Sequence, residues 1–267
     1  MVHAVETTGI DLPSLRLIEP ETLSVAERHA YEALLSDHVS FRRGERMMLS
    51  GDPVRHGLCI LKGWAISYRI TAAGRRQIVA IDLPGDFIGL ETGFTRRAIL
   101  TTDALTDVEA AQLDRAALRE ARERHPRLAA LLDWSVARSS NILGEHNVSL
   151  GARSAEERIL HLLLELWCRL SIVREAGADG FDMRMTQEQI ADAMGLTTVH
   201  TNRSLSALRK RGLVQMDGRR IRFPKLQEAM RAADFDPAFL EGFRGDDDSA
   251  RGIRPPQNPL EVLLASG

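Results

Sequence analysis

Short apolar stretches separated by glycines run through the first part of the chain and predict β-strands. The glycines stand at positions 44, 51, 57, 63, 74, 85, 89 and 93. We expect strands at residues 58–61, 64–70, 77–83 and 108–113, with Thr71 to Gly74 as a hairpin turn. Regular short strands joined by turns predict an all-β sandwich or barrel, and a jelly roll is one such fold.

From about Arg115 the apolar residues recur at helical spacing. Between Pro126 and Leu150 they follow a sevenfold repeat, which predicts a coiled-coil seam of about three heptads. The first column holds Ala129, Val136, Leu143 and Leu150, and the second holds Leu132, Ser139 and His146. Because the seam is short and partly polar, packing of this helix on its own β domain is the alternative to a dimer.

A further amphipathic helix is expected after an interruption at Gly151, with a hinge at residues 150–154. Its apolar residues are Ile159, Leu162, Leu163, Leu166 and Leu170. A helix with one apolar face must bury that face, and the next two helices along the chain are the expected partners.

Residues 186–214 have the pattern of a helix, a tight turn and a second helix. Thr186 and Gln189 have the spacing of a capping box at the start of the first helix, and Gly195 suits its end. Thr197 then offers a hydroxyl to cap a second helix, expected at 198–210. A turn of three residues is typical of a helix-turn-helix unit, which many DNA-binding proteins use.

The second helix has two faces. Val199, Leu205 and Leu208 are expected to face the protein. The polar residues are then free to enter a major groove. They are Thr198, His200, Asn202, Arg203 and Ser206.

A hairpin is expected next, because residues 213–216 and 220–223 flank Asp217 and Gly218, a pair that favours tight turns. This reads as the wing of a winged helix, and Arg219, Arg220 and Arg222 on it suit phosphate contacts. Residues 186–225 hold eight Lys and Arg against three acidic residues, whereas the whole chain has a net charge of −2. A local basic patch is what phosphate neutralisation requires, so the sequence predicts DNA binding. A basic helix-turn-helix with a merely solvated face is the alternative.

Composition agrees with a two-domain protein. The chain has 267 residues, of which 44% are hydrophobic and 27% charged, enough for two modest cores. No apolar run approaches the roughly 18 residues of a membrane span, and the N-terminus lacks a signal-peptide pattern. We therefore expect a cytoplasmic protein without a membrane partner. Cys59 and Cys168 are far apart and are expected to be buried free thiols.

The order of these parts resembles the Crp/Fnr family of bacterial transcription regulators over roughly residues 20 to 235. Residues 61–64 (LKGW) and 84–89 (PGDFIG) are similar to the family's sensor domain, and 151–170 to the entry of its DNA-binding domain. The resemblance implies an α+β protein that binds a palindromic promoter site as a homodimer, with double-stranded DNA and RNA polymerase as partners. The implied parts are a mobile N-terminal segment (1–20), a β jelly-roll sensor domain of the cyclic-nucleotide-binding type (21–124), a dimerisation helix (125–151), a winged helix-turn-helix DNA-binding domain (152–235) and a C-terminal tail (236–267).

Within this resemblance, Arg203 corresponds to the family's recognition-helix arginine, whose fork meets guanine O6 and N7. Many members have a glutamate four residues earlier, where this chain has Val199, which cannot accept from a cytosine amino group. The family's usual half-site is therefore not expected, and His200 and Asn202 are candidates for the missing contacts. The expected DNA-binding residues are Thr186, Gln187, Thr197, Thr198, Val199, His200, Asn202, Arg203, Ser206, Arg209, Lys210, Arg219 and Arg220.

The sensor domain departs further from the family. Cyclic-nucleotide members have a Gly-Glu pair and, about ten residues later, an arginine followed by a small residue. Here Gly89 precedes Leu90, Glu91 comes one place late, and Arg97 follows a shortened segment. Gly89, Glu91 and Arg97 are thus the candidate effector residues, with a surface ion pair as the alternative for the last two. The departures disfavour a cyclic nucleotide and leave the effector unknown.

No metal or other cofactor is expected. Iron–sulfur members of the family need four cysteines, and this chain has two. His29, His38 and His56 have no spacing that indicates haem ligation.

Two other functions are weighed against the regulator. In a small-ligand signalling module, whether or not it responded to a cyclic nucleotide, the winged helix would serve protein contacts. A jelly-roll metalloenzyme needs clustered ligands, whereas His38 and His56 stand eighteen residues apart. No nucleophile and base pattern emerges, so an enzyme is not expected.

Overall fold

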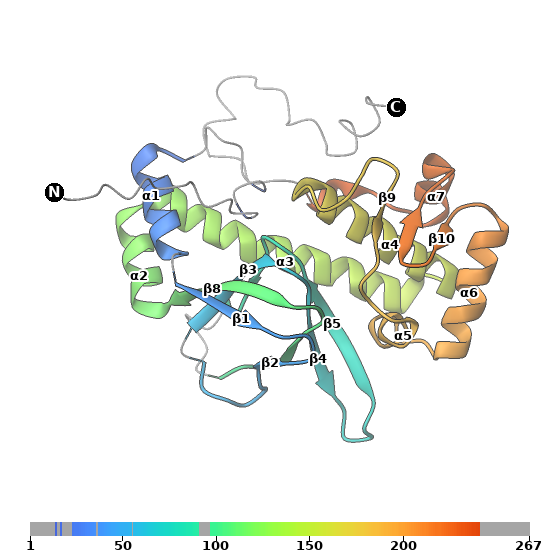
Figure 1. Ribbon diagram of the computed structural model, residues 1–267, viewed down its shortest axis with the longest axis horizontal. Helices are drawn as coiled ribbons and strands as arrows, with labels where there is room; N and C mark the ends of the chain where they lie inside the picture. Colours follow the sequence, from blue (N-terminus) through green and yellow to red (C-terminus); the bar gives the residue numbers. More distant parts are fainter. Residues whose placement is uncertain are drawn as a thin grey trace.

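The computed structural model describes residues 14, 17, 23–35, 37–54, 56–90 and 97–240. One long helix, α3 (Pro126–Ala152), crosses the molecule; the β domain lies on one side of it and the C-terminal helices gather at one end (Figure 1). The expected N-terminal tail lies outside the described residues apart from 14 and 17, and only residues 236–240 of the expected C-terminal tail are described.

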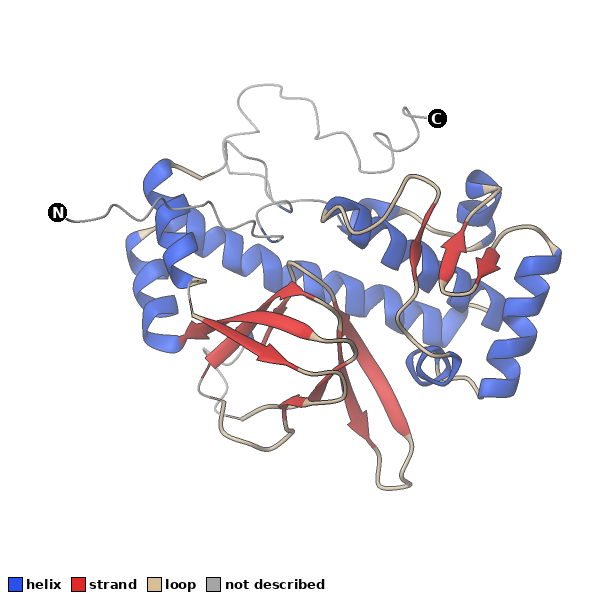
Figure 2. Cartoon of the chain, viewed as in Figure 1, coloured by secondary structure: helices blue, strands red, loops and turns tan. Residues whose placement is uncertain are grey.

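In the described residues eight strands form the β domain, which is red below α3 in Figure 2. Its two antiparallel sheets have the orders β1-β8-β3-β6 and β2-β7-β4-β5, which is the arrangement of a jelly roll. The strands are β1 (His38–Phe41), β2 (Arg46–Met48), β3 (His56–Lys62), β4 (Ala65–Ile70), β5 (Arg76–Asp82), β6 (Phe87–Ile88), β7 (Thr101–Ala104) and β8 (Val108–Asp114).

The four strands expected from the sequence are present as β3, β4, β5 and β8. The turn between β4 and β5 is also confirmed, since Gly74 has a φ of +76° and its N–H donates to Thr71 O. The sequence did not indicate β1, β2, β6 and β7, because each is only two to four residues long, too short for a hydrophobic period to be recognised.

Helices α1 (Val25–Leu34) and α2 (Arg115–Arg124) pack beside the first half of α3. Tyr31, Leu35, Cys59 and Leu128 are buried together there, and Cys59 is a free thiol, as expected. Pro126 is the first residue of α3, where its missing N–H costs nothing. The helix does not break at Gly151 itself, since α3 continues through it to Ala152; the break falls at Arg153 and Ser154, within the expected range of 150–154.

The C-terminal part begins with α4 (Ala155–Ile172), which starts at a capping box formed by Ser154 and Glu157. It contains β9 (Gly180–Asp182), α5 (Gln187–Met194), α6 (Thr198–Lys210), β10 (Gln215–Asp217), β11 (Arg220–Arg222), α7 (Leu226–Ala232) and a 3-10 helix (Pro237–Leu240). Every residue of α4 from Ile159 to Leu170 is buried, because α3, α5, α6, α7 and β9 surround it. The expectation that α4 packs behind the helix pair is confirmed, although it is buried on all sides.

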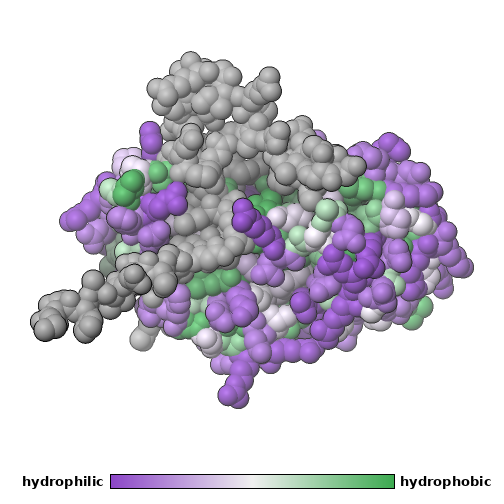
Figure 3. Space-filling view, turned by 45° about the horizontal axis from the view of Figure 1, so that its top comes forward, coloured by the Kyte–Doolittle hydropathy of each residue, from purple (hydrophilic) through white to green (hydrophobic). Residues whose placement is uncertain are grey.

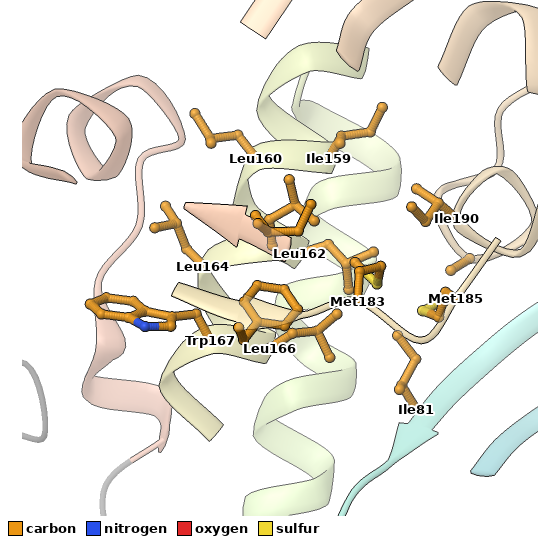
Figure 4. Packing of buried hydrophobic residues seen from close by; sticks show 14 of the residues in the cluster. Ile81, Ile159, Leu160, Leu162, Leu164, Leu166, Trp167, Met183, Met185 and Ile190 are labelled. Atoms are coloured by element: carbon orange, nitrogen blue, oxygen red, sulfur yellow. The ribbon is translucent and has the colours of Figure 1, made fainter. Parts of the chain in front are cut away.

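Figure 4 shows how the β domain joins this core. Ile81 of β5 reaches toward Met185 and Ile190, beside the side chains of α4. Close by, Arg76 Nε lies 2.7 Å from Asp192 Oδ2 on α5, and Gln77 donates to Ala193 O at 3.0 Å. The β4–β5 hairpin therefore contacts the first helix of the helix-turn-helix unit directly.

Candidate nucleic-acid interface

The turn between α5 and α6 has the geometry expected from the sequence. Gln189 N donates to Thr186 Oγ1 at 3.2 Å, and Thr186 N donates to Gln189 Oε1 at 2.8 Å, which completes the capping box. Gly195 ends α5 with a φ of 64°, a left-handed conformation that favours glycine. Thr197 caps α6 by accepting from His200 N at 3.2 Å. These local bonds set the angle at which α6 leaves α5.

The inner face of α6 differs from the expectation at one position. Leu205 and Leu208 are buried, as expected, but Val199 is 70% exposed, so its expected inward orientation was wrong. Val199 and Leu208 are nine residues apart. Because each residue turns the helix by about 100°, this separation places the two side chains on opposite sides of α6. Thr201, seven residues before Leu208, shares the inner face and is fully buried.

The outer face of α6 is polar and accessible. Among the described residues, Arg203 is exposed and has no hydrogen bond or ion pair, so its guanidinium is available to a ligand. Of the other expected contact residues in this unit, only Ser206 is half-buried, and it accepts from Arg209 at 3.0 Å. The remaining ones are exposed: Thr186, Gln187, Thr197, Thr198, Val199, His200, Asn202, Arg209 and Lys210.

The wing forms as expected, with β10 and β11 joined at Gly218, whose φ is +57°. A third strand that the sequence did not indicate, β9, pairs with β11. Arg219 at the tip is exposed, whereas Arg220 and Arg222 donate to the two carboxylate oxygens of Asp179 at 2.8 and 2.9 Å. These hydrogen bonds, that of Arg220 first, lower the pKa of the Asp179 carboxyl. Two of the three wing arginines therefore already have a counter-ion.

The surface around these elements is suited to a polyanion. Figure 3 shows hydrophilic residues over most of the end of the molecule formed by the C-terminal helices and wing. Eight Lys and Arg between residues 186 and 225 supply its positive charge, against Glu188, Asp192 and Asp217. Asp192 is itself paired with Arg76, which removes one of the three opposing charges.

A second exposed face lies on α3. Val136 and Leu143 are each 42% exposed, and Ser140 and Asn147 are exposed beside them. In the second column expected from the heptads, Leu132 and His146 are buried in the protein, whereas Ser139 is exposed. A heptad repeat assumes 3.5 residues per turn, whereas an α-helix has 3.6. Over this length the outward face therefore moves from Ser139 and His146 to the residues one place later, Ser140 and Asn147.

Buried charges connect α3, α4 and the β domain. Arg138 of α3 donates to Asp86 at 2.9 Å, and Arg169 of α4 donates both to Asp86 and, at 2.8 Å, to Glu165. His146 of α3 lies 2.7 Å from the other oxygen of Glu165. Burial would raise the pKa of Glu165, but His146 and Arg169 lower it to about 2. This cluster was not recognisable in the sequence, because its members are polar residues scattered over more than 80 positions.

A cavity of about 310 Å³ lies between the β domain and α3. Gly89 contributes to its lining, as expected, but Arg97 does not; its side chain donates to Gly51 O at 2.6 Å on the surface. Glu91, the third candidate effector residue, lies outside the described residues. The polar lining residues are Ser67, Asp82, Asp86, Thr102, Ser135, Ser139, Ser140 and Arg169.

A β jelly roll joined through a long helix to a winged helix-turn-helix is the architecture of a class of DNA-binding regulators. Residues 38–125 match the cyclic nucleotide-binding domain, and residues 157–228 match the Crp-like helix-turn-helix domain. The chain belongs to the Crp/Fnr family of transcription regulators, and it is a DNA-binding regulator of that type.

Several relatives are similar over most of the chain. The nitrogen fixation regulation protein FixK of Rhizobium meliloti is 30% identical over 72% of this chain and 85% of its own length. FixK of Bradyrhizobium diazoefficiens is 29% identical over 79% of this chain and 89% of its own. The structure of FixK2 from Bradyrhizobium japonicum, 28% identical, superposes with a TM-score of 0.66 over 78% of this chain and 98% of that one.

Proposed function

We propose that two copies of this chain bind a palindromic promoter site, with α6 of each copy in the major groove of one half-site. The observation that carries the proposal is the outer face of α6, where Arg203 is exposed and unpaired among the described residues. A guanidinium fork is complementary to guanine O6 and N7. The remaining exposed residues of α6 and the exposed Arg219 of the wing supply further base and phosphate contacts.

The face of α3 that carries Val136 and Leu143 supports the dimer. Partly exposed apolar side chains spaced seven residues apart suit a helix pair about a twofold axis. Such an axis presents two recognition helices to half-sites one DNA turn apart. RNA polymerase is the expected further partner of a regulator bound at a promoter, and the bacterial cytoplasm the expected location.

The proposal is tested by selecting bound duplexes from a random pool with the full chain and with Arg203→Ala. We expect the native chain to select inverted repeats with half-site centres about 10 base pairs apart. Arg203→Ala should lose one guanine preference, at a cost of ~1–3 kcal/mol in binding free energy. Arg124→Ala on α2, at the far end of the molecule in Figure 1, is the control that also removes one exposed arginine. Unchanged base preference in Arg203→Ala would refute the assignment.

A further inference from the structure

The exposed face of α6 carries one large apolar side chain in an otherwise polar surface. Val199 is 70% exposed, more than any other large hydrophobic residue in the described part of the chain except Val25. Its neighbours Thr198, His200, Asn202 and Arg203 are all polar and exposed. A single exposed valine is ordinary on a protein surface. Val199, however, lies on the face of α6 that the proposed function places against DNA.

Val199 is the second residue of α6. It lies in the N-terminal turn, the part of a recognition helix that contacts base edges in the major groove. Arg203 follows four residues later, so the two side chains are neighbours on one face. Four residues advance about 6 Å along a helix. Successive base pairs are about 3.4 Å apart, so Val199 faces a base pair within about two steps of the guanine that Arg203 binds.

The chemistry of valine restricts what it can recognise there. Its side chain has no donor and no acceptor, and the thymine C5 methyl is the apolar group that base pairs present in the major groove. Against the amino group of cytosine or adenine, the same side chain would exclude water and leave a donor unpaired. No Asp or Glu lies between Gly195 and Met216, so α6 offers no carboxylate to a cytosine amino group either.

We propose that Val199 is a specificity-determining residue, which selects a thymine through van der Waals contact with the C5 methyl group, within two base pairs of the guanine bound by Arg203. This inference rests on the proposed function, because it requires α6 to lie in the major groove.

Deoxyuridine tests the contact directly, because it differs from thymidine only by the methyl group. In a duplex carrying the selected site, each thymine of the half-site is replaced in turn by deoxyuridine, and the dissociation constant is measured at one salt concentration. We expect one position at which the native chain loses about fourfold in affinity, the effect of one methyl group removed from an apolar contact. Val199→Ala should lose most of this discrimination, because its shorter side chain makes fewer contacts with the methyl group.

Val25→Ala is the matched control, since Val25 is also an exposed valine in the first turn of a helix, at the other end of the molecule. This variant should keep the fourfold discrimination. A second variant, Val199→Glu, introduces a carboxylate acceptor and should shift the preference at that position from thymine to cytosine.

Two results would overturn the inference: a native chain that binds all uracil duplexes as well as the thymine duplex, or a Val199→Ala variant that keeps the discrimination. If either result accompanies a loss of guanine preference in Arg203→Ala, only the role of Val199 is refuted. If Arg203→Ala keeps its guanine preference, the proposed function itself fails.

Discussion

Arg169 on α4 donates a hydrogen bond to Asp86, which lies 83 residues earlier in the turn between β5 and β6. Both side chains are largely buried, and Arg138 of α3 binds the other oxygen of the same carboxylate. One carboxylate therefore joins the β domain, the long helix and the first helix of the DNA-binding part.

Removal of this carboxylate should be strongly destabilising. Asp86→Ala removes the ion pair of Arg138 and leaves Arg169 paired with Glu165 alone, and breaking a buried pair on one side costs about 3–5 kcal/mol. Urea unfolding followed by circular dichroism measures the loss. Glu120→Ala, which breaks the exposed pair with Arg124 on α2, should change the free energy of unfolding little. Equal effects of the two substitutions would contradict the role of Asp86.

The wing leads to a prediction about salt dependence. Asp179→Asn should release Arg222 for phosphate contacts and leave Arg220 with only its longer pair to Asp182, at 3.7 Å, so DNA affinity should rise and its decline with salt should become steeper. Arg219→Ala should have the opposite effect. It should flatten the slope of log K against log salt by about 0.9, the value expected for the loss of one phosphate contact.

Binding titrations between 50 and 200 mM salt, a range over which phosphate contacts are resolved, measure these slopes. Glu109→Gln in β8 is the control for Asp179→Asn, because it removes the same charge from an exposed pair in the β domain. If Asp179→Asn and Glu109→Gln gave the same slope, Asp179 would not restrain the wing.

Leu143→Asp should separate the proposed dimer, because it places a charge in the middle of the stripe formed by Val136, Ser140 and Asn147. Val148→Asp is its control: Val148 is also half exposed, but it lies about 140° around the helix from Leu143. Sedimentation velocity should find a monomer for the first variant and a dimer for the second. A Leu143→Asp variant that remained dimeric would show that another surface holds the two copies.

Two buried histidines should make stability depend on pH in opposite directions. Burial lowers the pKa of His161 from its usual 6.5 to about 4, so between these values the unfolded chain binds the additional proton and acid destabilises the fold. Burial would also lower the pKa of His146, but the charge of Glu165 and the hydrogen bond to it raise the value overall. His146 therefore contributes stability that is fully present below pH 6.5 and is lost as the pH rises through its folded pKa.

Replacement of each histidine should separate the two effects. His161→Phe keeps a ring beside Phe235. Between pH 7 and pH 5 the free energy of unfolding of this variant should fall by ~2 kcal/mol less than that of the native chain. His146→Gln should instead remove the decline in the free energy of unfolding that the native chain shows as the pH rises above 6.5. Urea unfolding at pH 5, 7 and 8.5 provides the measurement, and identical pH profiles for both variants and the native chain would contradict the assignment.

Cyclic AMP should not alter DNA affinity. Arg169 is the one Lys or Arg among the described residues that line the cavity, and it is engaged by Asp86 and Glu165. Among these described residues a cyclic phosphate would therefore meet no available cation, and Asp82 and Asp86 would repel it. Calorimetric titration of the protein with cyclic AMP should show no binding; a micromolar dissociation constant would refute this reasoning.

Local chemistry alone determined much of the fold. The caps at Thr186 and Thr197, the left-handed Gly195 and the Asp217-Gly218 turn act over a few residues, so the helix-turn-helix and the wing were recognisable in the sequence. The longer strands of the β domain were recognisable for the same reason.

The tertiary structure decided which polar residues are occupied and which are free. Periodicity could not show that Arg220 has a counter-ion in Asp179, that His146 faces Glu165 rather than a second copy, or that Asp86 binds Arg169. The exposure of Val199, by contrast, follows from the helical period, which sets it opposite Leu208 on α6. The pairings of Arg220, His146 and Asp86 depend on contacts between segments far apart in the chain, and such contacts form only when those segments pack together.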